Sequence, residues 1–97
     1  MRVTGASMLP TLRAGDEVFV DPRAYRHRLP QPGEIVVAWH PYQSDLKLIK
    51  RVATITADGD CFLASDNPAE GSDSRAFGAV PSQRLIGKVT SRRGASG

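Results

Sequence analysis

Apolar residues in this chain mostly alternate with polar ones or occur in short runs, a pattern typical of β-strands rather than helices. The pattern predicts five strands, at residues 17–21, 34–39, 46–56, 61–64 and 83–90. Turn residues separate them, such as Asp58-Gly59-Asp60 between the third and fourth strands. We therefore expect a mainly β fold of short, coiled antiparallel strands.

Three segments do not follow the strand pattern. Residues 22–33 are rich in Pro, Arg and Gly and are predicted to form a loop, and residues 91–97 are predicted to be a frayed tail. Residues 65–78 form a long polar loop, which in a small domain usually has a functional role. The length of 97 residues predicts one compact domain over residues 1–97.

The strand predicted at residues 46–56 carries a lysine among apolar residues. In a strand, alternate residues share a face. One face then holds Leu46, Leu48, Lys50, Val52 and Thr54. Burial would lower the pKa of the Lys50 amine, because desolvation disfavours the charged form, and a neutral amine can accept a proton. A second interpretation stays open, in which the side chain reaches from the sheet edge to water.

Composition and charge narrow the class of function. The net charge is +3, but the basic residues are scattered and no aromatic platform accompanies them, so nucleic acid is not predicted as a partner. The single cysteine, Cys61, suits a reducing compartment, and the chain offers no metal-binding cluster. We find no signal-peptide pattern and no run approaching about 18 apolar residues. We expect a soluble, cytoplasmic protein without a membrane span, a metal or another cofactor.

Few residues are candidates for nucleophilic chemistry. The histidines are His27 and His40, and neither has a motif around it, although a Ser-His-Asp triad stays possible by count. A serine can instead be activated by a neutral lysine. Ser7 lies in the segment G-A-S-M-L-P-T-L, whose Gly and Pro residues indicate a tight, non-helical turn. Such a turn can present a side chain to a cleft, but a serine there is most often only a turn residue.

Four motifs, in order along the chain, resemble those of signal peptidase I. They are Ser7-Met8-Leu9-Pro10-Thr11-Leu12 with Gly15-Asp16; Pro32-Gly33-Glu34-Ile35-Val36; Lys50-Arg51-Val52; and Asp66-Asn67 with Ser72-Asp73-Ser74-Arg75 and Gly78. The resemblance covers approximately residues 3–90. It implies the catalytic core fold shared by signal peptidase I and the LexA-like SOS repressors.

The resemblance also implies a serine endopeptidase with a Ser/Lys dyad. Ser7 would be the nucleophile, and Lys50 the general base that takes its proton and later returns it to the leaving amine. The backbone N–H of Ser7 would donate to the oxyanion, and Met8 would pack behind the nucleophile. Other residues implied to brace the site are Asp66, Asn67, Ser72, Asp73 and Arg75.

Two positions depart from the family pattern. Gly5 stands where many relatives carry a hydroxyl that helps to bind the oxyanion. Gly71 stands where relatives often place a serine beside the lysine amine, and Ser72 is only its neighbour in sequence. The second oxyanion donor and the residue that orients Lys50 are therefore open questions.

A narrower resemblance points to a substrate. The segment from His40-Pro41 to Asp45-Leu46, together with Asp66-Asn67-Pro68 and Phe77-Gly78-Ala79-Val80-Pro81, resembles the nickel-type superoxide dismutase maturation proteases. The resemblance implies removal of the N-terminal leader from the nickel superoxide dismutase precursor, which exposes a nickel-binding His-Cys terminus. The metal would then belong to the substrate.

Three alternatives stay open. The first is general leader processing of the signal peptidase I type. The second is a LexA-like self-cleaving domain, which the six residues before Ser7 make less suitable because such a domain needs a cleavable segment there. The third is a non-catalytic β module that binds peptide or nucleic acid, in which Ser7 and Lys50 would have no chemical role.

Overall fold

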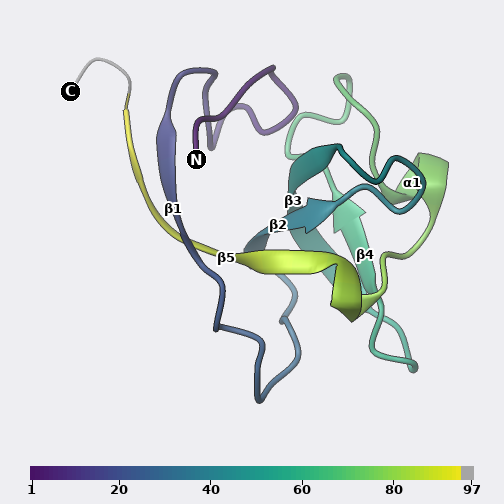
Figure 1. Ribbon diagram of the computed structural model, residues 1–97. Helices are drawn as coiled ribbons and strands as arrows, with labels where there is room; N and C mark the ends of the chain where they lie inside the picture. The colour runs from purple at the N-terminus through teal and green to yellow at the C-terminus, as the bar shows by residue number, and fades with distance from the viewer. Residues whose placement is uncertain (95–97) are drawn as a thin grey trace.

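The computed structural model describes residues 1–94 as one five-stranded antiparallel sheet with short helical turns beside it (Figure 1). The strands are β1 (Glu17–Asp21), β2 (Ile35–Trp39), β3 (Lys47–Ile55), β4 (Cys61–Ala64) and β5 (Leu85–Arg93). Their order across the sheet is β1-β5-β2-β3-β4, so the last strand in sequence lies near the middle. The mainly β fold expected from the hydrophobic pattern is confirmed.

The C-terminal prediction is wrong over residues 91–93, which continue β5 instead of forming a tail. These residues pair with β1 in the register Ser91↔Phe19, Arg92↔Val18 and Arg93↔Glu17. The hydrophobic pattern did not indicate this part of the strand, because its side chains are polar and exposed. Backbone pairing with β1, and not burial, holds these residues in the sheet. Residues 95–97 of the predicted tail lie outside the described residues.

The start of β5 also differs from the prediction. The turn Ser82–Arg84 forms a single 3-10 helix (η1), and the strand begins only at Leu85. The long polar loop contains one helical turn, α1 (Ser74–Phe77). Asp73 caps α1, because its side chain accepts a hydrogen bond from the Arg75 N–H.

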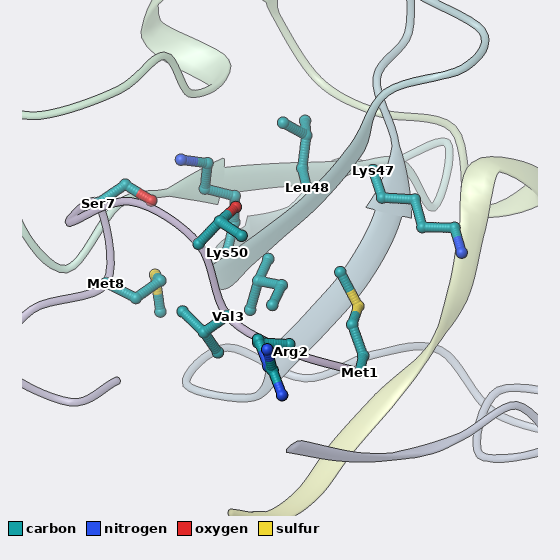
Figure 2. A pocket seen from close by; sticks show the side chains of 10 residues that line it. Met1, Arg2, Val3, Ser7, Met8, Lys47, Leu48 and Lys50 are labelled. Carbon is teal, nitrogen blue, oxygen red and sulfur yellow. The ribbon is translucent and has the colours of Figure 1, made fainter. Parts of the chain in front are cut away.

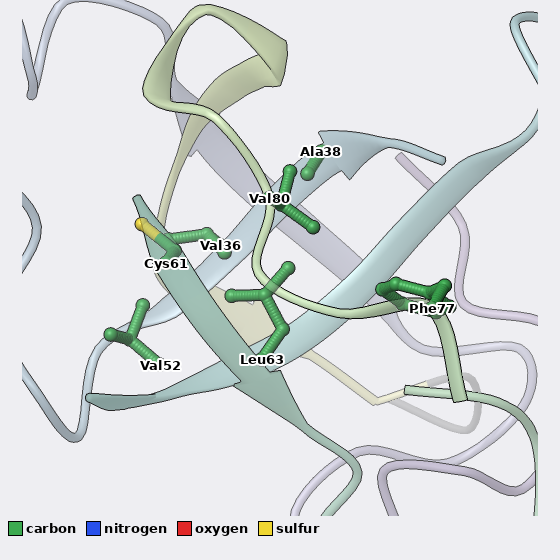
Figure 3. Packing of buried hydrophobic residues seen from close by; sticks show 7 residues of the cluster. All are labelled: Val36, Ala38, Val52, Cys61, Leu63, Phe77 and Val80. Atoms are coloured by element: carbon green, nitrogen blue, oxygen red, sulfur yellow. The ribbon is translucent and has the colours of Figure 1, made fainter. Parts of the chain in front are cut away.

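Two small apolar clusters stabilise the sheet. The first joins β2, β3 and β4 to α1 and the segment after it, and is shown in Figure 3; it contains Val36, Ala38, Val52, Cys61, Leu63, Phe77 and Val80. The second is formed by the N-terminal segment and β1, and contains Val3, Met8, Leu12 and Val18. Cys61 is fully buried, and burial raises the pKa of its thiol to about 11, so it acts as a small apolar side chain.

The alternation predicted for β3 holds through Val52. Leu48 and Val52 belong to the first cluster and Ile49 to the second, so the strand separates the two clusters as its period of two requires. The register between β3 and β4 shifts between Val52 and Thr54. Thr54 is exposed beyond this irregularity, which corrects its placement on the same face as Lys50.

Candidate active site

A compact turn holds Ser7 between the second apolar cluster and β3. Met8 is 2% exposed and packs into that cluster beside Val3 and Leu12. Leu12 N–H donates to the Met8 carbonyl at 2.8 Å, and Leu9 N–H donates to the Ala6 carbonyl at 3.2 Å. The buried methionine thus anchors the turn, while the adjacent Ser7 side chain is only half-buried.

Lys50 is a buried lysine in the middle of β3. The residue is 4% exposed and lies opposite Val36 of β2, on the face that carries Leu48 and Val52. Burial lowers the pKa of its amine, and the negative charge of Asp73 offsets part of that effect. A fraction of the amine is therefore neutral at a lower pH than for a lysine in water, as a general base requires.

The side chains of Ser7 and Lys50 converge on one small space. Figure 2 shows the hydroxyl and the amine at the same end of a cleft, with Met1 and Lys47 at the other end. A Cβ built on Gly71 would lie 3.8 Å from Ser7 Oγ and 3.4 Å from Lys50 Nζ, so the two reactive atoms surround this glycine. The cleft has a volume of about 160 Å³ and runs between residues 1–4 and 47–50.

Ser65 is the partner of the Lys50 amine, and sequence reasoning missed it. Lys50 Nζ donates to Ser65 Oγ at 2.9 Å, and both residues are buried. The β3–β4 register pairs Arg51 with Ala64, so one further step along the ladder sets Lys50 opposite Ser65. Counted back from the turn at residues 58–60, a regular ladder would instead set Lys50 opposite Asp66. The irregularity between Val52 and Thr54 brings Ser65 to this position, and no pattern in the sequence indicated that irregularity.

Gly71 and Ser72 do not supply the lysine partner. A Cβ on Gly71 would come within 3.0 Å of Ser7 Cβ, and its φ of +73° lies in the left-handed region, so a serine side chain does not fit there. Ser72 is exposed, and its hydroxyl makes no hydrogen bond to another described residue. The hydroxyl that relatives place at position 71 is thus supplied here from the end of β4.

Asp73 connects the loop to the lysine partner. Its carboxylate, in a residue only 3% exposed, accepts from Ser65 N–H at 3.0 Å and from both the backbone and the side chain of Arg75 at 3.0 Å. Burial raises the pKa of Asp73, but the Arg75 ion pair and the two backbone donors outweigh it and hold the pKa below its ordinary value. Ser65 is therefore fixed by a charged network on its backbone side.

Asp66 and Asn67 attach the same loop to two other parts of the site. Asp66 pairs with Arg51 through contacts of 2.8 and 2.7 Å and accepts from Thr11 Oγ1 at 2.6 Å. The Arg51 hydrogen bonds lower the pKa of this carboxyl group. Asn67 contacts the nucleophile turn itself, because its backbone N–H donates to the Ser7 carbonyl at 2.8 Å.

Gly5 and the histidines complete the set of sequence candidates. Gly5 has φ of +74°, and a Cβ there would meet no atom within 4 Å, so the position next to the cleft is open. His40 is buried, with Nδ1 accepting from Tyr42 N–H and Gln43 N–H, so it serves the turn after β2. Within residues 1–94, no group of three or more His, Cys, Asp or Glu side chains is placed to hold a metal ion.

Known proteins match this chain along most of its length. A family model described as signal peptidase, peptidase S26, matches residues 1–58. The mitochondrial inner membrane protease subunit 1 of Schizosaccharomyces pombe is 32% identical over 108 residues, which cover 92% of this chain and 69% of that protein. The human subunit of the same name is 27% identical, over 89% of this chain and 63% of its own length.

A bacterial protein gives a similar match. The probable signal peptidase I-1 of Synechocystis sp. is 27% identical over 130 residues, which cover 89% of this chain and 66% of that protein. The chain thus spans about two thirds of the length of the curated relatives it matches. In the part that the structure describes, no helix has both the length and the apolar character needed to span a membrane.

Proposed function

Because this chain belongs to the signal peptidase family, peptidase S26, we propose that it is a serine endopeptidase that removes N-terminal leader peptides. Ser7 is the proposed nucleophile and Lys50 the proposed general base. The observation that carries the proposal is the approach of a half-exposed hydroxyl to a buried amine whose pKa is lowered by desolvation. Ser65 holds that amine by accepting a hydrogen bond from it at 2.9 Å.

The proposed reaction has two stages. In the first, neutral Lys50 takes the Ser7 proton while Ser7 Oγ attacks the scissile carbonyl carbon, and the backbone N–H of Ser7 donates to the oxyanion. Lys50 then gives the proton to the amine of the mature chain, which leaves, and the leader stays esterified to Ser7. In the second stage Lys50 activates a water molecule that hydrolyses the ester and restores both residues.

The edge of β3 offers main-chain groups to an extended substrate. Leu46 accepts from His40 N–H and Val52 donates to Glu34, so the even-numbered residues of β3 turn their backbone groups toward β2. Lys47 and Ile49 therefore turn theirs to the opposite side, where pairing with β4 begins only at Arg51. A peptide added as a strand beside residues 47–49 would follow the cleft toward Ser7.

The substrate we propose is the nickel superoxide dismutase precursor. The proposal is supported by the resemblance of residues 40–46, 66–68 and 77–81 to the maturation proteases of that enzyme. The cut would follow the leader and free a His-Cys terminus, so nickel would be bound by the product. We further propose that the reaction takes place in the cytoplasm, where the buried thiol of Cys61 would stay reduced.

Incubation with the full-length precursor tests this function. The wild type should release a single leader, and mass spectrometry should find His-Cys at the new terminus, whereas Ser7→Ala and Lys50→Met should give no product. Ser72→Ala is the matched control and should cleave as the wild type does, since its exposed hydroxyl contacts nothing in the site. Cleavage that survives Ser7→Ala would refute the peptidase assignment.

A second substrate separates the specific function from general leader processing. An unrelated secretory precursor with its own leader should be cut far more slowly than the dismutase precursor. If both are cut at equal rates, the chain is a general leader peptidase and only the dismutase assignment fails.

A further inference from the structure

Asn67 holds the peptide groups on both sides of the nucleophile. Its side-chain Nδ2 donates to the Ala6 carbonyl at 3.1 Å, and its backbone N–H donates to the Ser7 carbonyl at 2.8 Å. These are the two consecutive carbonyls that flank the Ser7 nitrogen and Cα. One residue of the 65–78 loop thus fixes both peptide planes that meet at Ser7.

The first of these bonds determines where the Ser7 N–H points. The Ala6–Ser7 peptide is trans, since the one cis bond found among residues 1–94 is Leu9–Pro10. In a planar trans peptide the carbonyl and the following N–H point in opposite directions. Holding the Ala6 oxygen against Asn67 therefore directs the Ser7 N–H away from the loop.

The Ser7 N–H is also available to a ligand. It donates to no acceptor among the described residues, although Ser7 is half-buried and its own carbonyl is paired. Because Ser7 lines the cleft, an N–H there that has no protein acceptor is suited to bind an oxygen of the substrate. A donor from Asn67 to the same peptide unit also polarises it and strengthens the opposite N–H as a donor.

We infer that Asn67 is a positioning residue that aims and polarises the Ser7 N–H as the oxyanion donor, an inference that rests on the proposed peptidase function. A well-directed Ser7 N–H matters more here because Gly5 supplies no side-chain hydroxyl to stabilise the negative charge of the oxyanion. The backbone N–H then provides a larger share of the oxyanion stabilisation, so its orientation has a larger effect on the rate. Asn67 acts through the Ala6–Ser7 peptide and does not itself touch the substrate.

The test compares binding of a tetrahedral adduct with binding of an intact peptide. A peptide boronic acid forms a tetrahedral adduct on Ser7 and places an oxygen in the oxyanion site. The same peptide with an uncleavable amide, measured on the Ser7→Ala background, reports binding that does not use that site. Asn67→Ala removes the side-chain donor and keeps the backbone N–H, and Asn67→Asp is a second variant of nearly equal size.

We expect each Asn67 variant to weaken boronate binding about 10- to 100-fold, less than the roughly 100- to 1,000-fold effect of losing a whole oxyanion donor. Binding of the uncleavable peptide should change by less than about twofold, since misdirecting the donor leaves main-chain contacts along β3 in place. Thr11→Ala controls for general loosening, because it releases the same loop at Asp66 without touching Ala6 or the Asp73 network behind Ser65. It should lower the melting temperature but keep the ratio of the two affinities.

Other outcomes would overturn the inference. Equal losses for boronate and peptide, or no loss of boronate binding in an Asn67 variant that is folded, would show that Asn67 only supports the loop. The wild type also has to form the boronate adduct on Ser7, as seen by mass spectrometry. Failure of that step would remove the proposed function and this inference together, whereas normal adduct formation by all variants would remove the inference alone.

Discussion

At position 50, an ionisable side chain occupies a place where its charge is unfavourable. Burial lowers the pKa of the Lys50 amine. Among residues 1–94 the amine donates a hydrogen bond to Ser65 and forms no ion pair with a carboxylate. The negative charge of Asp73 offsets part of the effect of burial, while its oxygens accept hydrogen bonds from Ser65 N–H and Arg75. The site thus favours a neutral amine and still holds its position.

Removing the Ser65 hydroxyl should reduce kcat with little change in KM, because Lys50 would lose its orienting acceptor while the substrate edge stays intact. For Ser65→Ala we expect a loss of about 10- to 100-fold, typical of disturbed general-base catalysis. Steady-state kinetics on a leader peptide measure it. Ser65→Thr keeps a hydroxyl and should recover part of the rate, and full activity in Ser65→Ala would contradict the role given to Ser65.

A side chain at position 71 should block the reaction centre. In Gly71→Ala the new Cβ would meet Ser7 Cβ at 3.0 Å and force a residue with φ of +73° into strain. We expect covalent modification of Ser7, by phosphonylation with a fluorophosphonate or by adduct formation with a boronic acid, to fall at least tenfold. The loss of stability should be modest, about 1 kcal/mol. Gly94→Ala is the control, since its nearest neighbour would be 3.9 Å away.

Replacing Lys50 should make the protein more stable at neutral pH. The folded-state pKa lies below the ordinary lysine value of about 10.4, so the unfolded chain binds the proton more tightly and the lysine costs stability until the pH passes that value. Lys50→Met should therefore raise the urea midpoint at pH 7, and its advantage should shrink toward pH 10.5. An advantage that grows with pH would contradict the lowered pKa.

Among the elements, β1 and β4 were predicted with their observed bounds, and β3 to within one residue at each end. The bounds of β4 agree with the prediction, because alternating burial and a strong turn signal at residues 58–60 both mark this hairpin. The hairpin register carries Ser65 to Lys50, but pairing across strands is not visible in a pattern of faces alone. The end of β5 was missed for a similar reason, since Ser91, Arg92 and Arg93 are exposed and gain order from β1.

The close contact between β5 and the end of β1 depends on Gly87. A Cβ on Gly87 would clash with the Asp21 carbonyl oxygen and lie 2.8 Å from Val20 Cγ1. The carbonyl belongs to the backbone of β1, which cannot move without disturbing its pairing with β5. Gly87→Ala should destabilise the fold by about 1–3 kcal/mol, the usual cost of overpacking, or by more if β1 separates from β5. Urea unfolding beside Gly94→Ala measures the difference, and equal midpoints would show that β1 adapts without cost.

At the scale of the whole molecule, two small clusters and a set of ion pairs hold the chain. The loop at residues 65–78 connects the two clusters. It contributes Phe77 to the first cluster, and it binds the turn whose Met8 packs into the second. The sequence motifs pointed to this loop and to the Asp73–Arg75 pair, but Ser72 makes no hydrogen bond to another described residue. The partners of Asp66 and Asn67 were not predicted. Contacts such as that between Asn67 and Ala6 depend on how distant segments approach one another in the fold. A local sequence pattern does not show this.

Acid should unfold this protein through its paired carboxylates. Arg28 and other donors lower the pKa of Glu34 to about 2, and the pKa values of Asp66 and Asp73 are also lowered. Folded-state pKa values below the unfolded values stabilise the fold above about pH 4, and this stability is lost as the pH falls toward 2. Glu34→Gln should flatten the fall in melting temperature between pH 5 and 2, and an unchanged slope would contradict the pairing of Glu34.

Titration of the Lys50 amine shows whether it can act as a neutral base for Ser7. The chain has only three lysines, at positions 47, 50 and 88, so ¹³C labelling at lysine Cε gives three signals that Lys47→Arg and Lys88→Arg assign. The Lys50 signal should titrate below the ordinary lysine value, with the protein still folded, because burial lowers the pKa of its amine. A Lys50 signal that titrates at the ordinary value of about 10.4 or above would contradict a neutral lysine as the base for Ser7.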